Sequence, residues 1–290
     1  MQTAELKNAI LVNGEKSAVF PVGDRGLQYG HGLFETIAIK QGQLQHWDRH
    51  MARLVKGCTQ LSIKSPDLIQ LKNEAQQLTN QKDERDQKAD QAVLKIIYTC
   101  GEGGRGYKTP DQSQANRILS LSDWPDYPVE NDQTGVTVRL CETHLGSNPA
   151  LAGVKHLNRL EQVLARSEWS DPDIAEGLML DARGLMIEGT MSNVFFVKND
   201  TLCTPALTQC GVAGVMRELV LELAESIGVS TYIDDFTPAD IFQADEVFLT
   251  NSLIGIWPVN RVSSDQNVVY DPTRITTPKL VKLINEQYLT

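Results

Sequence analysis

One stretch decides how this sequence is interpreted: Gly153-Val154-Lys155-His156-Leu157-Asn158-Arg159-Leu160-Glu161-Gln162-Val163. From near His156 to near Trp169 the pattern predicts an amphipathic helix, and Lys155 stands just before it. A lysine at that place indicates no function by itself, because most lysines are solvated and the positive end of a helix dipole disfavours another positive charge. The role of Lys155 therefore depends on the rest of the chain.

Size and charge limit the classes of protein to consider. The chain has 290 residues, of which 41% are hydrophobic and 22% charged, so we expect a soluble globular protein with two domains. Lys and Arg number 27 against 37 Asp and Glu, a net charge of -10 that repels nucleic acid. An acidic exterior still permits an anionic small molecule to bind in a pocket where a few donors converge.

Cysteine usage and hydropathy bear on the compartment. The 5 cysteines are scattered without a CxxC pair, so neither a zinc site nor a disulfide framework is predicted. Glu5 and Lys7 interrupt the apolar residues at the N-terminus, and no stretch approaches the length of a membrane span. We expect a cytoplasmic protein that binds neither nucleic acid nor membrane.

Turn and periodicity signals predict the elements of the first part of the chain. Asn13-Gly14 and Gln41-Gly42 favour hairpin turns. Asp48 is expected to cap one helix, and Pro66 to begin another that reaches about residue 79. The polar run Gln81–Gln91 predicts a solvated loop. The expected strands are Ala9–Val12, Ser17–Phe20, Leu33–Lys40, Ala92–Thr99 and Asn116–Leu121.

Two prolines in Trp124–Pro128 predict a linker at 123–130, between a small domain at 1–122 and a larger one at 131–290. Along the chain, the expected strands and helices are interleaved without a regular βαβ order, which favours the α+β class. The expected strands of the larger domain are Val136–Cys141, Gly177–Leu180, Asn193–Val197, Val229–Ile233 and Glu246–Leu249. The other expected helices are Val215–Ile227, with Gly228 at its end, and one that begins at Thr277-Pro278.

Further strings accompany the lysine segment in a fixed order. They are Asp24–Gly26, Tyr29–Thr36, His50–Leu54, Gly103–Tyr107, Ile187–Phe195 and Gly211–Arg217. With Gly153–Val163 they resemble the aminodeoxychorismate lyases within the fold-type IV, or class IV aminotransferase, family of pyridoxal-phosphate enzymes. The resemblance covers nearly the whole chain. It implies a small two-layer α/β domain, a larger C-terminal pseudobarrel domain and a homodimer.

The resemblance also implies a cofactor site. Lys155 would bind pyridoxal phosphate covalently, and Glu188 would keep the ring nitrogen protonated, as an electron sink requires. Arg53 would contact the phosphate, although an exposed helix arginine has the same sequence pattern. The other cofactor candidates are Asn193, the backbone amides of Val215 and Met216, and Asn251, the weaker candidate because a loop Asn more often serves a turn.

Substrate residues follow from the same resemblance. The Gly-rich loop Gly101–Gly106 lacks the Lys-Ser/Thr of a nucleotide-binding loop. The resemblance implies that it brings Arg105 and Tyr107 to the substrate's carboxylates. A surface hairpin tip explains this loop equally well. Tyr29 is a further substrate candidate. Thr36 would help a proton transfer, or act only as a strand hydroxyl bonded to a neighbour.

The implied reaction is the conversion of 4-amino-4-deoxychorismate to 4-aminobenzoate and pyruvate, a step of folate biosynthesis. The alternative is a D-amino-acid or branched-chain aminotransferase, which uses the same lysine and cofactor. Leu160, beside Arg159, fills the place of the tyrosine that branched-chain transaminases carry after the lysine, and this disfavours that substrate class. A non-catalytic relative is disfavoured because Lys155, Glu188 and Arg53 are all present.

Overall fold

The computed structural model describes residues 9–16, 19–83, 91–264 and 267–287. The chain divides into two compact units. The first unit contains the chain up to Pro125 together with Lys155–Asn158, and the second contains Asp126–Val154 and the chain from Arg159 onward. The division after Pro125 lies within the stretch expected as a linker, whereas the membership of Lys155–Asn158 in the first unit is not evident from the sequence. The domain limits 1–122 and 131–290 stay predictions.

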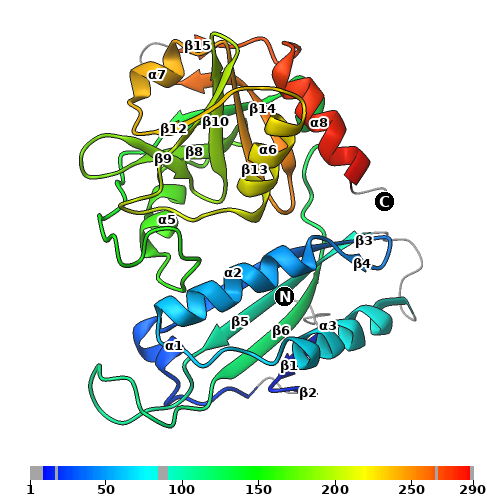
Figure 1. Cartoon of the computed structure of the whole chain (residues 1–290), viewed down its shortest axis with the longest axis vertical. Coiled ribbons are helices and arrows are strands. Elements are labelled where there is room, and N and C mark those ends of the chain that lie inside the picture. The colour runs from blue at the N-terminus through cyan, green and yellow to red at the C-terminus, as the bar shows by residue number, and fades with distance from the viewer. Residues whose placement is uncertain (1–8, 17–18, 84–90, 265–266, 288–290) are drawn as a thin grey trace. The chain divides into compact units, whose positions relative to one another are not determined.

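The first unit contains a six-stranded sheet in the order β2-β1-β6-β5-β3-β4, and each neighbouring pair is antiparallel (Figure 1). Its strands are β1 (Ala9–Val12), β2 (Glu15–Lys16), β3 (Gly32–Lys40), β4 (Gln43–Leu44), β5 (Gln91–Thr99) and β6 (Asn116–Asp123). In β3 the alternate residues Leu33, Ile37 and Ile39 are buried, as the period of two of a strand requires. The long central strands were predictable from this alternation.

The first hairpin differs from its prediction. β1 pairs with β2 through Leu11 with Lys16, across a turn with positive φ at Asn13 (53°) and Gly14 (88°). The Asn-Gly turn is confirmed, but the return strand is Glu15–Lys16 instead of Ser17–Phe20. Residues 17 and 18 lie outside the described residues, and residues 19 and 20 are not in a strand.

The described residues of the first unit form the helices α1 (Arg25–Tyr29), α2 (Trp47–Gln60) and α3 (Leu68–Asp83). Helix α2 packs on β3, and α3 packs on β1 and β6 (Figure 1). The prediction that Asp48 caps α2 is wrong, because the N-cap is His46 and Asp48 lies inside the first turn. An acid there still interacts favourably with the helix dipole.

Helix α3 begins two residues after Pro66. Asp67 Oδ1 accepts hydrogen bonds from the N–H groups of Ile69 (2.9 Å) and Gln70 (3.0 Å), so Asp67 stabilises the start of the helix. The helix continues to Asp83, so the loop expected at 81–91 was wrong for residues 81–83. Residues 84–90 lie outside the described residues, and residue 91 already belongs to β5.

The second unit is built on a nine-stranded sheet in the order β12-β11-β10-β13-β14-β7-β8-β9, with β15 paired to β14. Its strands are β7 (Val136–Leu140), β8 (Ile174–Leu180), β9 (Met186–Gly189), β10 (Asn193–Lys198), β11 (Thr201–Pro205), β12 (Thr231–Asp234), β13 (Glu246–Asn251), β14 (Gly255–Ser263) and β15 (Val268–Val269). Strand β9, at one end of this order, also packs against β10 and β11, so the sheet curls back on itself. The expected pseudobarrel and the α+β class are confirmed.

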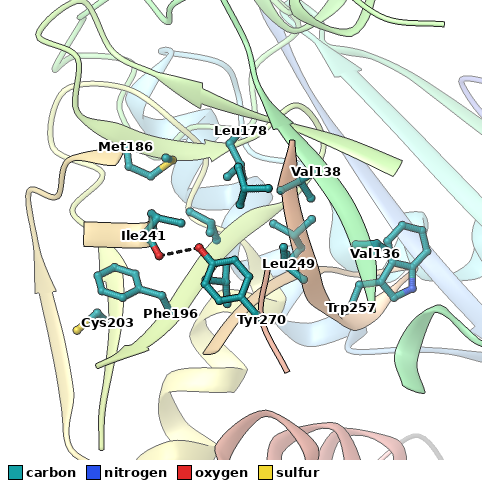
Figure 2. Close-up of a cluster of buried hydrophobic side chains, with 14 of the residues drawn as sticks. Val136, Val138, Leu178, Met186, Phe196, Cys203, Ile241, Leu249, Trp257 and Tyr270 are labelled. Atoms are coloured by element: carbon teal, nitrogen blue, oxygen red, sulfur yellow. Dashed lines mark hydrogen bonds between the residues drawn. The ribbon is translucent and has the colours of Figure 1, made fainter. Parts of the chain in front are cut away.

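An apolar cluster fills the inside of this curl (Figure 2). Val138, Leu178 and Phe196 reach it from three different strands, and Ile241 and Tyr270 are also among its members. The Tyr270 hydroxyl donates a 2.8 Å hydrogen bond to the carbonyl of Ile241, so its polar end is satisfied within the core.

A second apolar cluster lies on the other face of β10 and β13. Phe195 stacks on Phe248 with ring centroids 5.1 Å apart, and the cluster includes side chains of α6 (Val215–Ser226) and α8 (Thr276–Gln287). Because Phe195 and Phe196 are consecutive in one strand, they point to opposite faces of the sheet. Both faces of the strand are therefore buried. The starts of both helices agree with prediction, and Gly228 follows α6 with a φ of 72°.

The remaining helices are short: α4 (Asn131–Thr134), α5 (Leu160–Arg166) and α7 (Pro238–Phe242). The helix expected from near His156 to near Trp169 is only α5, and its sole buried residue is Ala165. His156–Asn158 are not helical, because this stretch lies along β3 of the first unit. None of the described helices has the length and apolar character needed to cross a membrane.

Candidate active site

Lys155 lies in extended backbone beside the first residues of β3. The N–H of Phe34 donates to the carbonyl of Lys155 (3.1 Å), and the N–H of Leu157 donates to the carbonyl of Gly32 (3.0 Å). These two bonds form an antiparallel bridge between Leu33 and His156. The backbone of Lys155 is therefore fixed by a sheet edge and not by a helix start.

The Lys155 side chain lies over an aromatic ring. Its Nζ is 4.3 Å from the centroid of Phe34, a distance at which an ammonium interacts with the ring face. Thr36 is two residues further along β3, so its side chain is on the same face of the sheet as Phe34. The structure thus places the two predicted catalytic residues, Lys155 and Thr36, on one face of β3.

The opposite face of β3 carries a buried ionic group. Arg53 on α2 donates through Nε to Glu35 Oε1 (2.9 Å) and through Nη2 to Glu35 Oε2, and His50 Nδ1 lies 2.6 Å from Oε2. Burial raises the pKa of Glu35, but Arg53 and His50 outweigh burial and hold this pKa at about 2. Burial lowers the pKa of His50, opposed by Glu35, and the charge of Lys155 lowers it further.

This carboxylate fixes the orientation of the predicted phosphate arginine. Two of the guanidinium nitrogens of Arg53 contact one carboxylate, which is the bidentate geometry that holds an arginine most firmly. Sequence reasoning assigned no role to Glu35. The available signal was the alternation of β3, since Glu35 falls in phase with the buried residues Leu33 and Ile37.

Two of the predicted substrate residues contact each other in the first unit. The rings of Tyr29 and Tyr107 meet edge to face with centroids 5.4 Å apart. Tyr107 is 84% exposed, and Arg105, two residues before it, is exposed as well. Arg25, which sequence reasoning did not single out, lies against both tyrosines through its ring contact to Tyr29 and its bond to the carbonyl of Tyr107.

In the second unit, Glu188 is buried in β9, one residue before the end of the strand. Its Oε2 accepts a 2.8 Å hydrogen bond from the N–H of Val212. Its negative charge acts on two arginines: burial lowers the pKa of both Arg159 and Arg217, and Glu188 opposes that shift in each. A carboxylate near two guanidinium groups is electrostatically favoured in its charged form.

Asn193, the first residue of β10, also contacts Val212, which lies in the turn 211–214. Its Nδ2 donates to the carbonyl of Val212 (2.9 Å), and a Cβ on Gly214 would lie only 2.0 Å from its Oδ1. Gly153 also binds this turn. Its N–H donates to the carbonyl of Gly211 (2.9 Å), and its carbonyl accepts from the N–H of Ala213 (3.1 Å). Hydrogen bonds with Glu188, Asn193 and Gly153 thus hold the turn 211–214 in place.

This turn leads directly into α6. Gly214 is the N-cap residue and has no side chain to accept from the first-turn amides, which include those of Val215 and Met216. Such a helix start attracts anions, because its N–H groups and its dipole both favour negative charge. The residues present therefore fit a phosphate group at this end of α6.

A buried carboxylate organises the segment between Glu188 and Asn193. Glu176 on β8 accepts hydrogen bonds from the N–H groups of Gly177 (2.9 Å), Thr190 (3.2 Å) and Met191 (3.1 Å), and from the hydroxyls of Thr190 and Ser192. Burial raises its pKa, and these hydrogen bonds oppose the shift. Sequence reasoning missed Glu176, because nothing in its local pattern shows where its donors lie.

Asn251, at the end of β13, has the contacts of a turn residue. Its Oδ1 accepts from the N–H groups of Leu253 (2.9 Å) and Ile254 (3.0 Å), and its Nδ2 donates to the carbonyl of Met191 (3.1 Å). This is the simpler of the two interpretations of its sequence pattern. Its contact with a phosphate stays a prediction. Among the described residues, no group of three or more His, Cys, Asp or Glu could hold a metal ion.

This chain is similar to known lyases and aminotransferases in sequence and in structure. A family model described as amino-transferase class IV matches residues 32–262. An aminodeoxychorismate lyase of Vibrio harveyi is 40% identical over 274 residues, which are 94% of this chain and 98% of that protein. A putative branched-chain-amino-acid aminotransferase of Methanocaldococcus jannaschii is 30% identical and covers 86% of each chain. The crystal structure of 4-amino-4-deoxychorismate lyase from Pseudomonas aeruginosa is similar with a TM-score of 0.88 at 45% identity, over 96% of this chain and 98% of that one.

Proposed function

This chain belongs to the amino-transferase class IV family, and we propose that it is an aminodeoxychorismate lyase, which converts 4-amino-4-deoxychorismate to 4-aminobenzoate and pyruvate with pyridoxal phosphate as cofactor. The observation that carries the proposal is the identity of 40% and 45% to two lyases over nearly their full lengths, against 30% to a putative aminotransferase. Leu160, beside Arg159, fills the place of the tyrosine of branched-chain transaminases, which disfavours that class of transaminase.

Pyridoxal phosphate, when bound, supplies an electron sink for the charge left on a substrate carbon. Lys155 would bind it covalently, and Glu188 would hold the proton on its ring nitrogen. Arg53, oriented by Glu35, and the first-turn amides Val215 and Met216 would contact its phosphate. Asn193 would support these amides through Val212, and Asn251 is a further candidate for the phosphate.

The reaction needs two proton transfers and one bond cleavage. The amine of Lys155 would remove the proton from the ring carbon that bears the substrate nitrogen. The carbon–oxygen bond to the enolpyruvyl group then breaks, the ring becomes aromatic, and the departing enolpyruvate takes up a proton to give pyruvate. Thr36, on the same face of β3 as Phe34, would assist that second transfer. A threonine hydroxyl is a weak acid, so a water molecule or the cofactor phosphate would assist it.

Substrate recognition would come from the first unit. The substrate carries two carboxylates, and Arg105 offers a guanidinium that can bind one of them in a bidentate manner. Tyr107 and Tyr29, whose rings are in contact, would add hydroxyl donors and an aromatic surface for the substrate ring.

A product assay tests the proposal most directly. The purified, cofactor-loaded protein should release pyruvate and 4-aminobenzoate in equal amounts from aminodeoxychorismate, and Lys155→Ala should release neither. A parallel incubation with D-alanine or L-leucine and a 2-oxo acid should show little amino-group exchange. Rapid exchange without pyruvate release would identify an aminotransferase instead.

We also propose that the protein is a cytoplasmic homodimer. Helix α5 supports association with a second copy, because Leu160, Val163 and Leu164 are 69%, 57% and 54% exposed in the single chain. Sedimentation velocity should give the mass of a dimer, and Val163→Glu should shift the equilibrium toward the monomer. A monomeric wild-type protein would contradict the dimer without affecting the assignment of the reaction.

A further inference from the structure

Among the described residues, Arg25 has neutral hydrogen-bond partners only. It lies on α1, is 3% exposed, and donates to three acceptors: Nε to His31 Nδ1 (3.2 Å), Nη1 to the carbonyl of Gly106 (3.0 Å) and Nη2 to that of Tyr107 (2.7 Å). Among the described residues, no carboxylate pairs with it. A buried cation without a counter-ion costs free energy, so its position calls for a function beyond stabilising α1.

The guanidinium fixes one particular loop. Its two Nη atoms bind consecutive carbonyls, which are 81 and 82 residues away in the chain, and its planar fork can satisfy both only in one loop conformation. The loop also passes close to the side chain, since a Cβ on Gly103 would lie 3.0 Å from Arg25 Cδ. Segment 103–107 therefore packs against Arg25 at Gly103 and is hydrogen-bonded to it at Gly106 and Tyr107.

Arg25 is itself held in place from two directions. The guanidinium carbon lies 5.0 Å from the centroid of the Tyr29 ring, and that ring meets Tyr107. His31 accepts from Arg25 at Nδ1, so its Nε2 carries the proton and donates to the carbonyl of Leu61 (2.8 Å) at the end of α2. A chain of contacts thus connects α2, α1 and the loop.

We propose that Arg25 is a positioning residue: it sets the conformation of segment 103–107 and thereby places Arg105 and Tyr107 for the carboxylates of the substrate. This inference rests on the proposed function for its substrate, but not for its structural part. Two arginines would then have different roles at segment 103–107. Arg105 provides the exposed charge, and Arg25 provides the fixed backbone.

Kinetics of matched variants test the proposal. Arg25→Met should raise KM for aminodeoxychorismate by about tenfold, the effect of losing one strong charge-assisted contact, and should change kcat by less than about threefold. The spectrum of the bound cofactor should not change. Arg117→Met is the control, because Arg117 is another largely buried arginine of this unit and its partner is Glu74. It should lower stability and leave KM unchanged.

Two further measurements keep the proposal testable if Arg25→Met is poorly folded. Arg25→Lys keeps the charge but not the fork, and should show an intermediate rise in KM. In a double-mutant cycle with Arg105→Met, the KM of the double variant should equal that of Arg105→Met alone, because Arg25 acts through Arg105. Additive effects, or equal rises in KM for the Arg25 and Arg117 variants, would overturn the proposal.

Trypsin gives a readout that does not depend on the substrate. Cleavage after Arg105 should become about tenfold faster in Arg25→Met, since the loop then samples extended conformations more often, and should not change in Arg117→Met. Unchanged cleavage at Arg105 would refute the positioning role whatever the reaction is. A wild-type enzyme that releases no pyruvate would refute the proposed function alone, if the cleavage difference is still observed.

Discussion

Glu188 Oε2 accepts a 2.8 Å hydrogen bond from the backbone N–H of Val212, and Asn193 Nδ2 donates to the carbonyl of the same residue at 2.9 Å. Two side chains from β9 and β10, which are consecutive along the chain, therefore bind both backbone polar groups of Val212, two residues before the N-cap of α6. Glu188 is expected to act on the ring nitrogen of the cofactor. Its bond to Val212 indicates that it also fixes the turn before α6, whose first amides are proposed to bind the cofactor phosphate.

Substitution of Glu188 separates these two roles. Glu188→Gln keeps an oxygen that can accept from Val212 but removes the negative charge. The variant should fold and bind the cofactor, and kcat should fall by at least about a hundredfold, because the ring nitrogen loses the charge that keeps it protonated. Pyruvate release and the cofactor spectrum measure this. A Glu188→Gln enzyme with wild-type kcat would contradict the assignment.

Gly214 is expected to be essential for cofactor affinity. An alanine Cβ there would lie 2.0 Å from Asn193 Oδ1, so Gly214→Ala must displace Asn193 or the start of α6. The dissociation constant for pyridoxal phosphate should rise by about tenfold or more, which corresponds to a moderate overpacking penalty. Gly104→Ala is the control, since nothing lies within 4 Å of its Cβ position. Equal affinities of the two variants would show that the turn adapts without cost.

Glu35 should make stability depend on pH in a defined window. Its pKa is lowered from 4.5 to about 2 in the folded chain, so the stability it contributes is complete above about pH 4.5 and is lost as pH falls toward about 2. The loss should be on the order of 3 kcal/mol. Urea denaturation of the wild type and Glu35→Gln measures this: the difference in unfolding free energy should shrink over that window. A constant difference from pH 5 to pH 2 would contradict the predicted pKa.

Local sequence signals correctly predicted the strands and turns for which tertiary packing favours the same structure as the local residues do. The alternation in β3 and β5 and the turn at Asn13-Gly14 describe structure formed by near neighbours, and these predictions are confirmed. Helix α7 was missed although its capping box, Thr237 with Asp240, is visible in the sequence.

The lysine segment shows where local reasoning fails. His156–Asn158 have helical periodicity with the residues that follow, but their backbone pairs with β3, more than a hundred residues earlier. A pairing over that separation overrides local preference and leaves no local signal. The positioning residues Arg25 and Glu176 were missed for the same reason, because their partners are fixed by the fold.

Glu176→Gln tests whether the segment between Glu188 and Asn193 depends on one carboxylate. The glutamine amide nitrogen must face at least one backbone N–H that the carboxylate now accepts, and that donor is then buried without an acceptor. The unfolding free energy should fall by about 2 kcal/mol, the usual cost of such a donor. Cofactor affinity should fall as well, because Glu188 and Asn193 flank the loosened segment. Glu225→Gln, an exposed change on α6, should alter stability by less than about 0.5 kcal/mol and leave cofactor affinity unchanged. If the two variants are equally stable in urea and bind the cofactor equally, Glu176 does not organise this segment.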